Sequence, residues 1–225
     1  MTVAELHALS QLVNQALKGP GVGLTLAVAG VVLAVAALVL MTSFTRIVVV
    51  LSFVRTAVGT PASPPNPVII ALALVMTGIT MSPVLTEINR VAVAPLIAGH
   101  LSLVGAIVHA GVPMRRFLLN GTSRSSLGML YHALKRPFPA SARHVPFMLL
   151  VLGFTTSQLT AAFQMAVTLY IPFLIIDLVV ASVLMSLGMM MLPPTVVSLP
   201  IKLLLFVAVN GWGLVIGSLL TMGHL

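Results

Sequence analysis

Very few side chains in this sequence could perform catalytic chemistry. Its 225 residues include three carboxylates, Glu5, Glu87 and Asp177, which lie too far apart along the chain to form a local acid–base or metal-binding pair. The sequence has no cysteine, which excludes disulfides, cysteine-ligated metals and thiol nucleophiles. Its six histidines form no H-x-x-x-H cluster, and no Gly-rich phosphate loop ending in Lys-Ser or Lys-Thr occurs. We therefore expect neither an enzyme nor a bound cofactor or metal.

One carboxylate, Asp177, stands within a long apolar run, Tyr170–Val180. A carboxylate is costly to bury in hydrocarbon, so such a residue usually faces a partner or a wet cavity, and many have functional roles. Two interpretations stay open: a functional role inside the membrane, or a structural role in which Asp177 caps a helix or pairs with a base. Lys202 follows Pro200, and we expect its long side chain to reach the membrane surface rather than to pair with Asp177.

A cluster of methionines is the second unusual feature. Met189, Met190 and Met191 are consecutive, follow Gly188 and precede two prolines, so a helix must end near them. Methionine side chains are unbranched and adaptable. They could therefore close a pore and later mould around a passing chain, or they could simply fill gaps between helices.

Membrane helices must position these residues. Apolar residues make up 59% of the chain and charged residues 6%, whereas a soluble domain carries about 25% charged residues. Six charge-free stretches exceed the roughly 20 residues that cross a bilayer: 19–45, 56–86, 91–114, 144–176, 178–201 and 203–225. The poorest is Val91–Met114, which contains two prolines and three glycines and could re-enter the membrane or lie on its surface. The sequence predicts an all-α, polytopic membrane protein built from helical hairpins.

We predict four parts along the chain. Residues 1–21 form an N-terminal amphipathic segment without the features of a cleaved signal, and residues 22–86 form a hairpin reversed at the proline-rich turn Thr60–Pro67. Residues 87–143 form a polar, basic connection, and residues 144–225 form a second membrane hairpin with the methionine-rich loop. In the last part, Gly213-x-x-x-Gly217 predicts close contact with another helix.

The connection is strongly basic. Arg115–Arg143 holds six of the 11 basic residues and no acidic residue. A solvated connector and contact with anionic lipid are both compatible with this charge. We expect no nucleic-acid binding, because no interleaved aromatic residues or known motif accompany the charge. The positive-inside rule places the side of the membrane that holds Arg46 and Arg55 in the cytoplasm, and it favours the same side for this loop.

Several long runs resemble the FliP family, the flagellar export-gate proteins related to the R component of virulence-type type III secretion systems. The double proline after the methionines is more similar to the flagellar members. The runs that carry the resemblance are Met41–Leu51, Gly59–Asn66, Met81–Pro83, Ile171–Met185, Gly188–Pro194 and Leu199–Val207.

The resemblance implies a multi-pass subunit in the bacterial inner membrane, within the flagellar basal body. Several copies of such a subunit assemble with FliQ-like and FliR-like subunits, other export-gate proteins and membrane lipids into a helical ring. The channel of that ring admits unfolded export substrates, and the family's methionine-rich loop seals its constriction. Here that role would fall to Met189, Met190 and Met191.

The resemblance also implies four membrane segments, at about 22–45, 66–86, 165–191 and 199–221. This arrangement puts Arg115–Arg143 on the outer side, against the positive-inside rule. A span at Val91–Met114 would satisfy that rule. We expect the four-segment arrangement, because helices packed in an assembled complex are less constrained by the rules of lipid insertion.

The chain departs from the family where the family is usually charged. Gln158 and Thr160 stand where an acid and a base are usual, and Asn210 replaces a second acid. If those charges pair between subunits, the neutral hydrogen bonds available here are roughly half as strong. We expect the membrane-embedded polar residues to contribute to assembly; they are Arg46, Gln158, Asp177, Lys202 and Asn210.

Three alternatives to a flagellar export gate stay open. One is the corresponding subunit of a virulence-type injectisome. A small-molecule or ion transporter would predict internal repeats and charge pairs along a pathway, and the sequence shows no repeat and only Asp177. A purely structural membrane scaffold predicts that the methionine cluster tolerates substitution.

Overall fold

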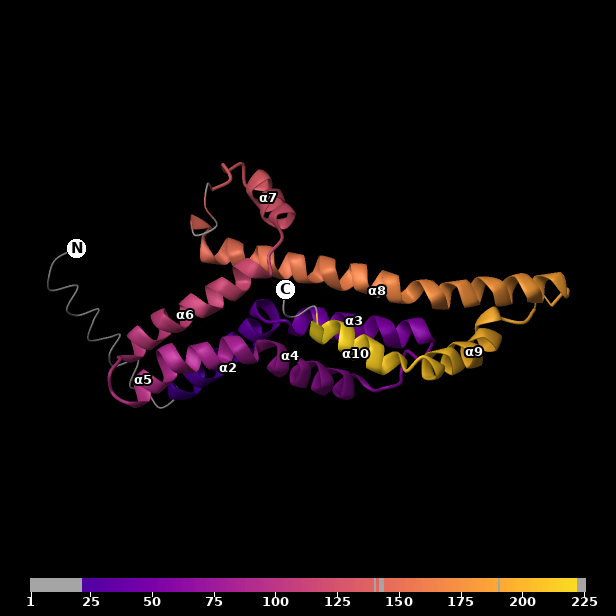
Figure 1. The fold of residues 1–225 in the computed structure, drawn as a ribbon, viewed down its shortest axis with the longest axis horizontal. Coiled ribbons are helices and arrows are strands. Elements are labelled where there is room, and N and C mark those ends of the chain that lie inside the picture. Colours follow the sequence, from indigo (N-terminus) through magenta and orange to yellow (C-terminus); the bar gives the residue numbers. More distant parts are fainter. Residues whose placement is uncertain (1–21, 140, 142–143, 190, 222–225) are drawn as a thin grey trace. The chain divides into compact units, whose positions relative to one another are not determined.

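The computed structural model describes residues 22–139, 141, 144–189 and 191–221 of the chain (Figure 1). In this part of the chain every regular element is helical and there is no strand, which confirms the predicted all-α class. The predicted amphipathic segment 1–21 lies outside the described residues. The chain divides into two compact units, Met1–Val39 and Leu40–Leu225. The division into four parts drawn from the sequence stays a prediction.

The first unit contributes most of α2 (Val22–Met41), which ends just inside the second unit. Its 20 residues are almost all valine, alanine, leucine and glycine, and none is charged. Leu24 and Leu33 are exposed, as are most of the large apolar side chains described along this helix; Leu38, Val39 and Met41 near its end are half-buried. Such a helix cannot be stable with this surface in water, and its length suits the hydrocarbon of a bilayer.

The second unit begins with a hairpin, formed by α3 (Phe44–Val58) and α4 (Asn66–Ile88). Gly59 ends α3 in the left-handed conformation, with φ at 91°, where a side chain would add steric cost. Arg55 then closes the turn: its Nη1 atom donates to the carbonyl oxygen of Pro64 at 3.0 Å and to Oδ1 of Asn66 at 2.7 Å. The chain thus reverses at the proline-rich turn, while the predicted hairpin over residues 22–86 stays a prediction, because most of α2 belongs to the other unit.

Beyond α4 the helix continues further than predicted. It passes through a π-helical turn, η1 (Asn89–Val93), into α5 (Ala94–Ile97), so that a helical run of 32 residues extends from Asn66 to Ile97. The run stops before Gly99, which has φ at 75°, and α6 (Leu103–Asn120) begins after it. A continuous span over Val91–Met114 is therefore wrong, because the left-handed glycine breaks the helix in its middle.

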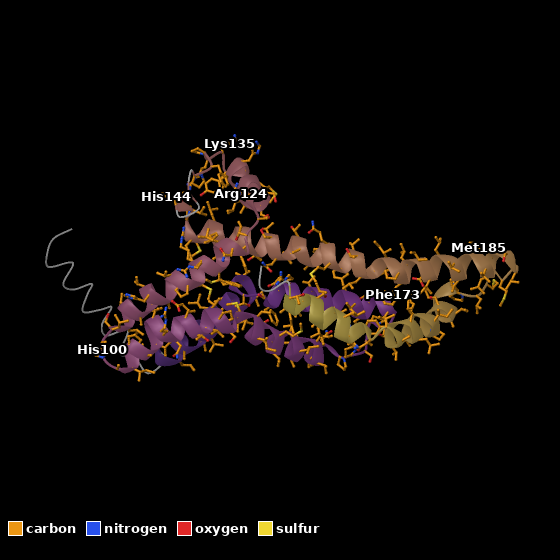
Figure 2. The ribbon with its side chains drawn as sticks, in the orientation of Figure 1. His100, Arg124, Lys135, His144, Phe173 and Met185 are labelled. Atoms are coloured by element: carbon orange, nitrogen blue, oxygen red, sulfur yellow. The ribbon has the colours of Figure 1, made fainter. Side chains whose placement is uncertain are left out.

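The basic connection folds onto the N-terminal end of the long helix α8 (Phe147–Ser186). It consists of α6, α7 (Arg124–Ala133) and the loops around them, and Figure 2 shows Arg124, Lys135 and His144 gathered on this protruding part. Buried apolar side chains attach it to α8, namely Leu118, Leu127, Tyr131, Val145, Leu150 and Phe154. The basic segment is thus a packed structure as well as a connector.

The helix α8 has 40 residues and is about 60 Å long at 1.5 Å per residue. The membrane segment expected at about 165–191 overlaps the C-terminal half of this helix, which begins earlier, at Phe147. Ser157 and Gln158 are polar but buried against the connection, so they do not mark a helix end. Further along, α8 packs beside α3 (Figure 1), where Ala162 and Phe173 join the core that contains Ile47.

The chain returns through α9 (Pro194–Ala208) and α10 (Gly211–Thr221). These two helices are bent by 60° relative to each other, and Asn210 at the break has φ at 51°. The segment expected at about 199–221 thus corresponds to this bent pair rather than to one straight helix. By length and composition, three described helices can cross a membrane (Gly23–Met41, Asn66–Ile97 and Phe147–Ser186), and the bent pair is a fourth if it counts as one span.

The four-span arrangement predicts the side on which the basic connection lies. Ser125 is exposed on α7, between the second and third spans, and Ala62 is exposed in the turn between the first and second. The chain has no cysteine, so single Ser125→Cys and Ala62→Cys variants can each be labelled from one side of the membrane at a time. We expect the thiol at position 125 to react only from outside and the thiol at position 62 only from the cytoplasm. Labelling of position 125 from the cytoplasm alone would contradict the arrangement.

Candidate functional site

The candidate site is the hairpin that α8 and α9 form, together with the loop Leu187–Pro193 that joins them. The helix α8 ends at Ser186, and Gly188 then turns the chain with φ at 75°. Pro194 occupies the first turn of α9, where its fixed φ suits a helix start. Figure 2 shows Met185 at the end of α8, beside this loop. Local signals thus place the methionine-rich loop at the tip of the hairpin.

The methionines at the tip project away from the rest of the chain. The exposed fraction is 45% for Met189 and 98% for Met191. Met190 lies outside the described residues. Met189 and Met191 therefore fill no gap between helices of their own chain, and the tip presents soft, apolar side chains to whatever surrounds it.

An ion pair joins the two arms of the hairpin. Lys202 donates from Nζ to Oδ2 of Asp177 at 2.6 Å, and Ser198 donates from Oγ to Oδ1 of the same carboxylate, also at 2.6 Å. Lys202 is buried, with an exposed fraction of 5%. The expectation that Lys202 would reach the membrane surface is wrong. Asp177 had two interpretations, a functional role in the membrane or a structural role. The structure shows the structural pairing with a base, and Asp177 lies in the interior of α8 rather than at a helix cap.

The antiparallel return of α9 explains this pairing. Ser198 and Lys202 are four residues apart, so they share one face of α9, and that face is turned toward Asp177. Removing an ammonium and a carboxylate from water costs several kcal/mol per ion, and only close pairing with further hydrogen bonds offsets that cost. The sequence analysis did not predict a role for Ser198, although its spacing of four residues to Lys202 could have indicated that the two share a partner.

Two of the other residues predicted for assembly are bonded or buried in separate places. Gln158 donates from Nε2 to the carbonyl oxygen of Gly121 at 3.2 Å, and its Oε1 atom is buried without a hydrogen-bond partner among the described residues. A carboxylate at this position would face the Gly121 carbonyl, which is also an acceptor, so within this chain the neutral amide is the better match. Arg46 lies at the start of α3 and is half-buried, and its Nε atom has no hydrogen-bond partner among the described residues.

The predicted glycine motif makes no helix contact inside the described chain. A Cβ atom at Gly213 would lie 2.5 Å from Nδ2 of Asn210, whose side chain folds over the start of α10. At Gly217 no atom lies within 4 Å of the place a Cβ would take. The Gly213 contact is thus local to the bend, and packing through Gly217 stays a prediction about contact with another chain.

Comparison with known proteins identifies the family. The FliP family model matches residues 27–219, which include the whole of α8 and α9. The chain belongs to the FliP family. It is 49% identical over 183 residues to the flagellar biosynthetic protein FliP of Bacillus subtilis (strain 168), which covers 81% of this chain and 83% of that protein. With its apolar helices, the chain is a membrane protein of this family.

Other FliP relatives are similar over comparable lengths. The flagellar biosynthetic protein FliP of Pectobacterium carotovorum subsp. carotovorum is 46% identical over 217 residues, covering 94% of this chain and 84% of its own. That of Caulobacter vibrioides (strain ATCC 19089 / CIP 103742 / CB 15) is 45% identical over 208 residues, covering 89% and 78%. The likeness to FliP proteins therefore extends through both hairpins and the connection between them.

Removing one partner of the ion pair should destabilise this FliP chain more than removing both. We expect Lys202→Met to lower the free energy of unfolding by about 2 kcal/mol, because Asp177, whose side chain is 31% exposed, then keeps its charge with no base beside it. The double variant Asp177→Asn, Lys202→Met should recover part of that loss, because no uncompensated charge remains. A double-mutant cycle of unfolding free energies in detergent micelles measures the coupling.

Arg124→Met is the matched control, since it removes one exposed cation that is not part of a described ion pair. We expect it to change the free energy of unfolding by less than about 0.5 kcal/mol. If the losses from the two single variants at Asp177 and Lys202 simply add in the double variant, the pair does not stabilise the hairpin.

Proposed function

We propose that this chain is a core subunit of the flagellar type III protein export gate and forms part of the channel that passes unfolded flagellar proteins across the bacterial inner membrane. Membership of the FliP family supports this proposal. The compared relatives bear the name flagellar biosynthetic protein FliP, which favours the flagellar gate over the virulence-type injectisome. The proposed location is the flagellar basal body.

The exposed methionine loop is the observation that carries the proposal. A hairpin joined by an ion pair between the buried Lys202 and the partly exposed Asp177 ends in an apolar tip that its own chain leaves uncovered. When several copies bring such tips together, they form a dry apolar constriction that excludes ions. Methionine side chains can change rotamer to let a polypeptide through and then close again. Met189, Met190 and Met191 are therefore the proposed gasket.

The proposed partners are further copies of this chain, FliQ-like and FliR-like subunits, other export-gate proteins and membrane lipids, with unfolded proteins as substrates. Large exposed apolar side chains on α4 and α8 support contact with lipid or other subunits; examples are Val75, Ile79, Val167, Leu174 and Leu178. Apolar surface of this extent is not stable in water, so assembly in the membrane is the state in which we expect the chain to function.

We propose that the chain is not an enzyme. Of the carboxylates in the described residues, Asp177 is bound to Lys202 and Ser198, and Glu87 is paired with Arg90 at 2.8 Å. Both carboxylates are thus held in ion pairs with a base, which leaves neither free to act as a general base. The locked Asp177–Lys202 pair also gives no support to a transporter, whose pathway needs charged groups that exchange partners.

Replacing the gasket tests this proposal. We expect the triple variant Met189→Ala, Met190→Ala, Met191→Ala to make the inner membrane leak ions, because the constriction loses the side chains that fill it. Deleting the whole chain should abolish export of flagellar filament protein without any leak, since no channel is assembled. Membrane potential and ion flux in cells measure the leak, and secreted filament protein measures export.

The double variant Met129→Ala, Met148→Ala is the matched control. Both methionines are exposed, at 57% and 78%, but lie on α7 and at the start of α8, away from the hairpin tip. We expect it to leave ion flux unchanged. An unchanged conductance in the triple variant, with the protein still assembled, would mean that the loop is not the seal.

A further inference from the structure

Methionine is the only sulfur-containing residue that can be oxidised in this chain, because the sequence has 13 methionines and no cysteine. The described methionines differ widely in exposure. Met76 and Met81 are buried in α4, whereas Met191 has the largest exposed fraction among those described, at 98%. Oxidation of a sulfur depends on access to the oxidant. The hairpin tip therefore carries the described thioether that a water-soluble oxidant reaches most readily.

The place of the tip in the proposed gate keeps this access. Met189 and Met191 lie in the loop beyond the end of α8, where the described helices of their own chain do not cover them. When the tips of several copies meet around the channel, their side chains face the path of the exported chain. A channel that admits a polypeptide also admits small oxidants from its aqueous side, as far as the constriction itself.

The reaction of a thioether with a peroxide needs no cofactor and no catalytic group. The methionine sulfur attacks one oxygen of the peroxide, the O–O bond breaks and an S–O bond forms. The sulfur loses two electrons and the peroxide gains them, and after proton transfer each molecule of hydrogen peroxide leaves as one molecule of water. The product, methionine sulfoxide, is polar but uncharged.

A sulfoxide in the constriction works against the seal. A hydrophobic constriction blocks ions because water does not wet it. The sulfoxide oxygen accepts hydrogen bonds, and burying an acceptor without a donor costs free energy. Leu187, Met189 and Met191 are exposed apolar side chains of the tip and donate no hydrogen bond to it. The sulfoxide therefore keeps its water, and each oxidised copy brings more water into the constriction.

The rest of the hairpin does not depend on the thioethers of the tip. Asp177 holds α9 on α8 through Lys202 and Ser198, each at 2.6 Å, and none of these three side chains contains sulfur. The buried Met76 and Met81 are shielded within α4. Oxidation of the tip thus changes the seal and leaves the fold intact, and exposed sulfoxides can be reduced back to thioethers by enzymes.

We propose that Met189 and Met191 are a reversible oxidation site, at which peroxides convert the seal of the export gate from dry to wet. The inference rests on the proposed function, because it assigns a modification to the proposed gasket. It goes beyond that function in two respects: the closed gate leaks ions when these methionines are oxidised, and it closes again when the sulfoxides are reduced.

Ion flux through the assembled gate tests the proposal. The gate is purified with its partner subunits, reconstituted in lipid vesicles without an export substrate, and treated with hydrogen peroxide. We expect peptide mass spectrometry to find one added oxygen atom on Met189 and on Met191 and none on Met76 or Met81. Ion flux should rise toward that of the triple alanine variant. If positions 189 and 191 stay unoxidised while the exposed Met148 is oxidised, the proposal is wrong.

Leucine variants identify the methionines responsible. The triple variant Met189→Leu, Met190→Leu, Met191→Leu keeps an apolar tip of similar volume that peroxide cannot oxidise. We expect it to stay closed after peroxide treatment. The matched control, Met129→Leu, Met148→Leu, removes two exposed methionines away from the tip and should leak as much as the native gate does. An equal leak from the triple leucine variant would place the sensitive residues elsewhere and overturn the proposal.

Enzymatic reduction tests the native sequence without any substitution. Methionine sulfoxide reductases for the two sulfoxide epimers, supplied with a thiol reductant, return each sulfoxide to a thioether and release one water. We expect ion flux to fall back to its value before oxidation. A leak that persists once mass spectrometry shows positions 189 and 191 reduced would mean that peroxide acts on another part of the gate, against the proposal.

The two proposals can fail separately. If the triple alanine variant leaks but native gates stay closed with positions 189 and 191 oxidised, the gasket stands and the oxidation site does not. An unchanged conductance in the triple alanine variant would remove the gasket, and the oxidation site with it.

Discussion

An ion pair between the buried ammonium of Lys202 and the partly exposed carboxylate of Asp177 holds α9 on α8. An ammonium group can stay buried at an exposed fraction of 5% only if a carboxylate and further hydrogen bonds replace its water. Because Ser198 takes the second oxygen of the same carboxylate, α9 has one favourable register on α8. That register sets where the turn at Gly188 falls, and it therefore keeps the apolar methionine tip at the end of the hairpin.

The small number of acidic residues affects the charge balance of the whole chain. With three carboxylates against 11 basic residues, the chain cannot neutralise its own positive charge. It has a neutral amide at Gln158, where an acid would face a carbonyl oxygen, and it leaves the Arg46 guanidinium without an anion among the described residues. These features fit a subunit whose positive charge is balanced by its surroundings, because a half-buried cation such as Arg46 is costly to leave without a counter-charge.

Local signals in the sequence predicted much of this architecture, and long-range contacts account for what they missed. Glycine and proline placed the first turn and the methionine loop, because such residues act on backbone conformation where they stand. The helix α8 begins before the membrane segment expected at about 165, and the basic connection covers its first turns: Gln158 is bonded to Gly121, 37 residues away along the chain, a contact that no local pattern reveals. The partner of Lys202 and the bend at Asn210 likewise depend on how α9 folds back against α8.

If the hairpin tip seals the channel, it must touch the protein that is being exported. A photo-activated cross-linker, p-benzoylphenylalanine, placed at Met191 in cells with an export substrate arrested in the gate, tests it most directly. Met148 has a comparable exposure, 78% against 98%, but lies at the opposite end of α8 and serves as the matched position. We expect cross-links to the substrate from position 191 and none from position 148. Cross-links from Met148 with none from Met191 would contradict it.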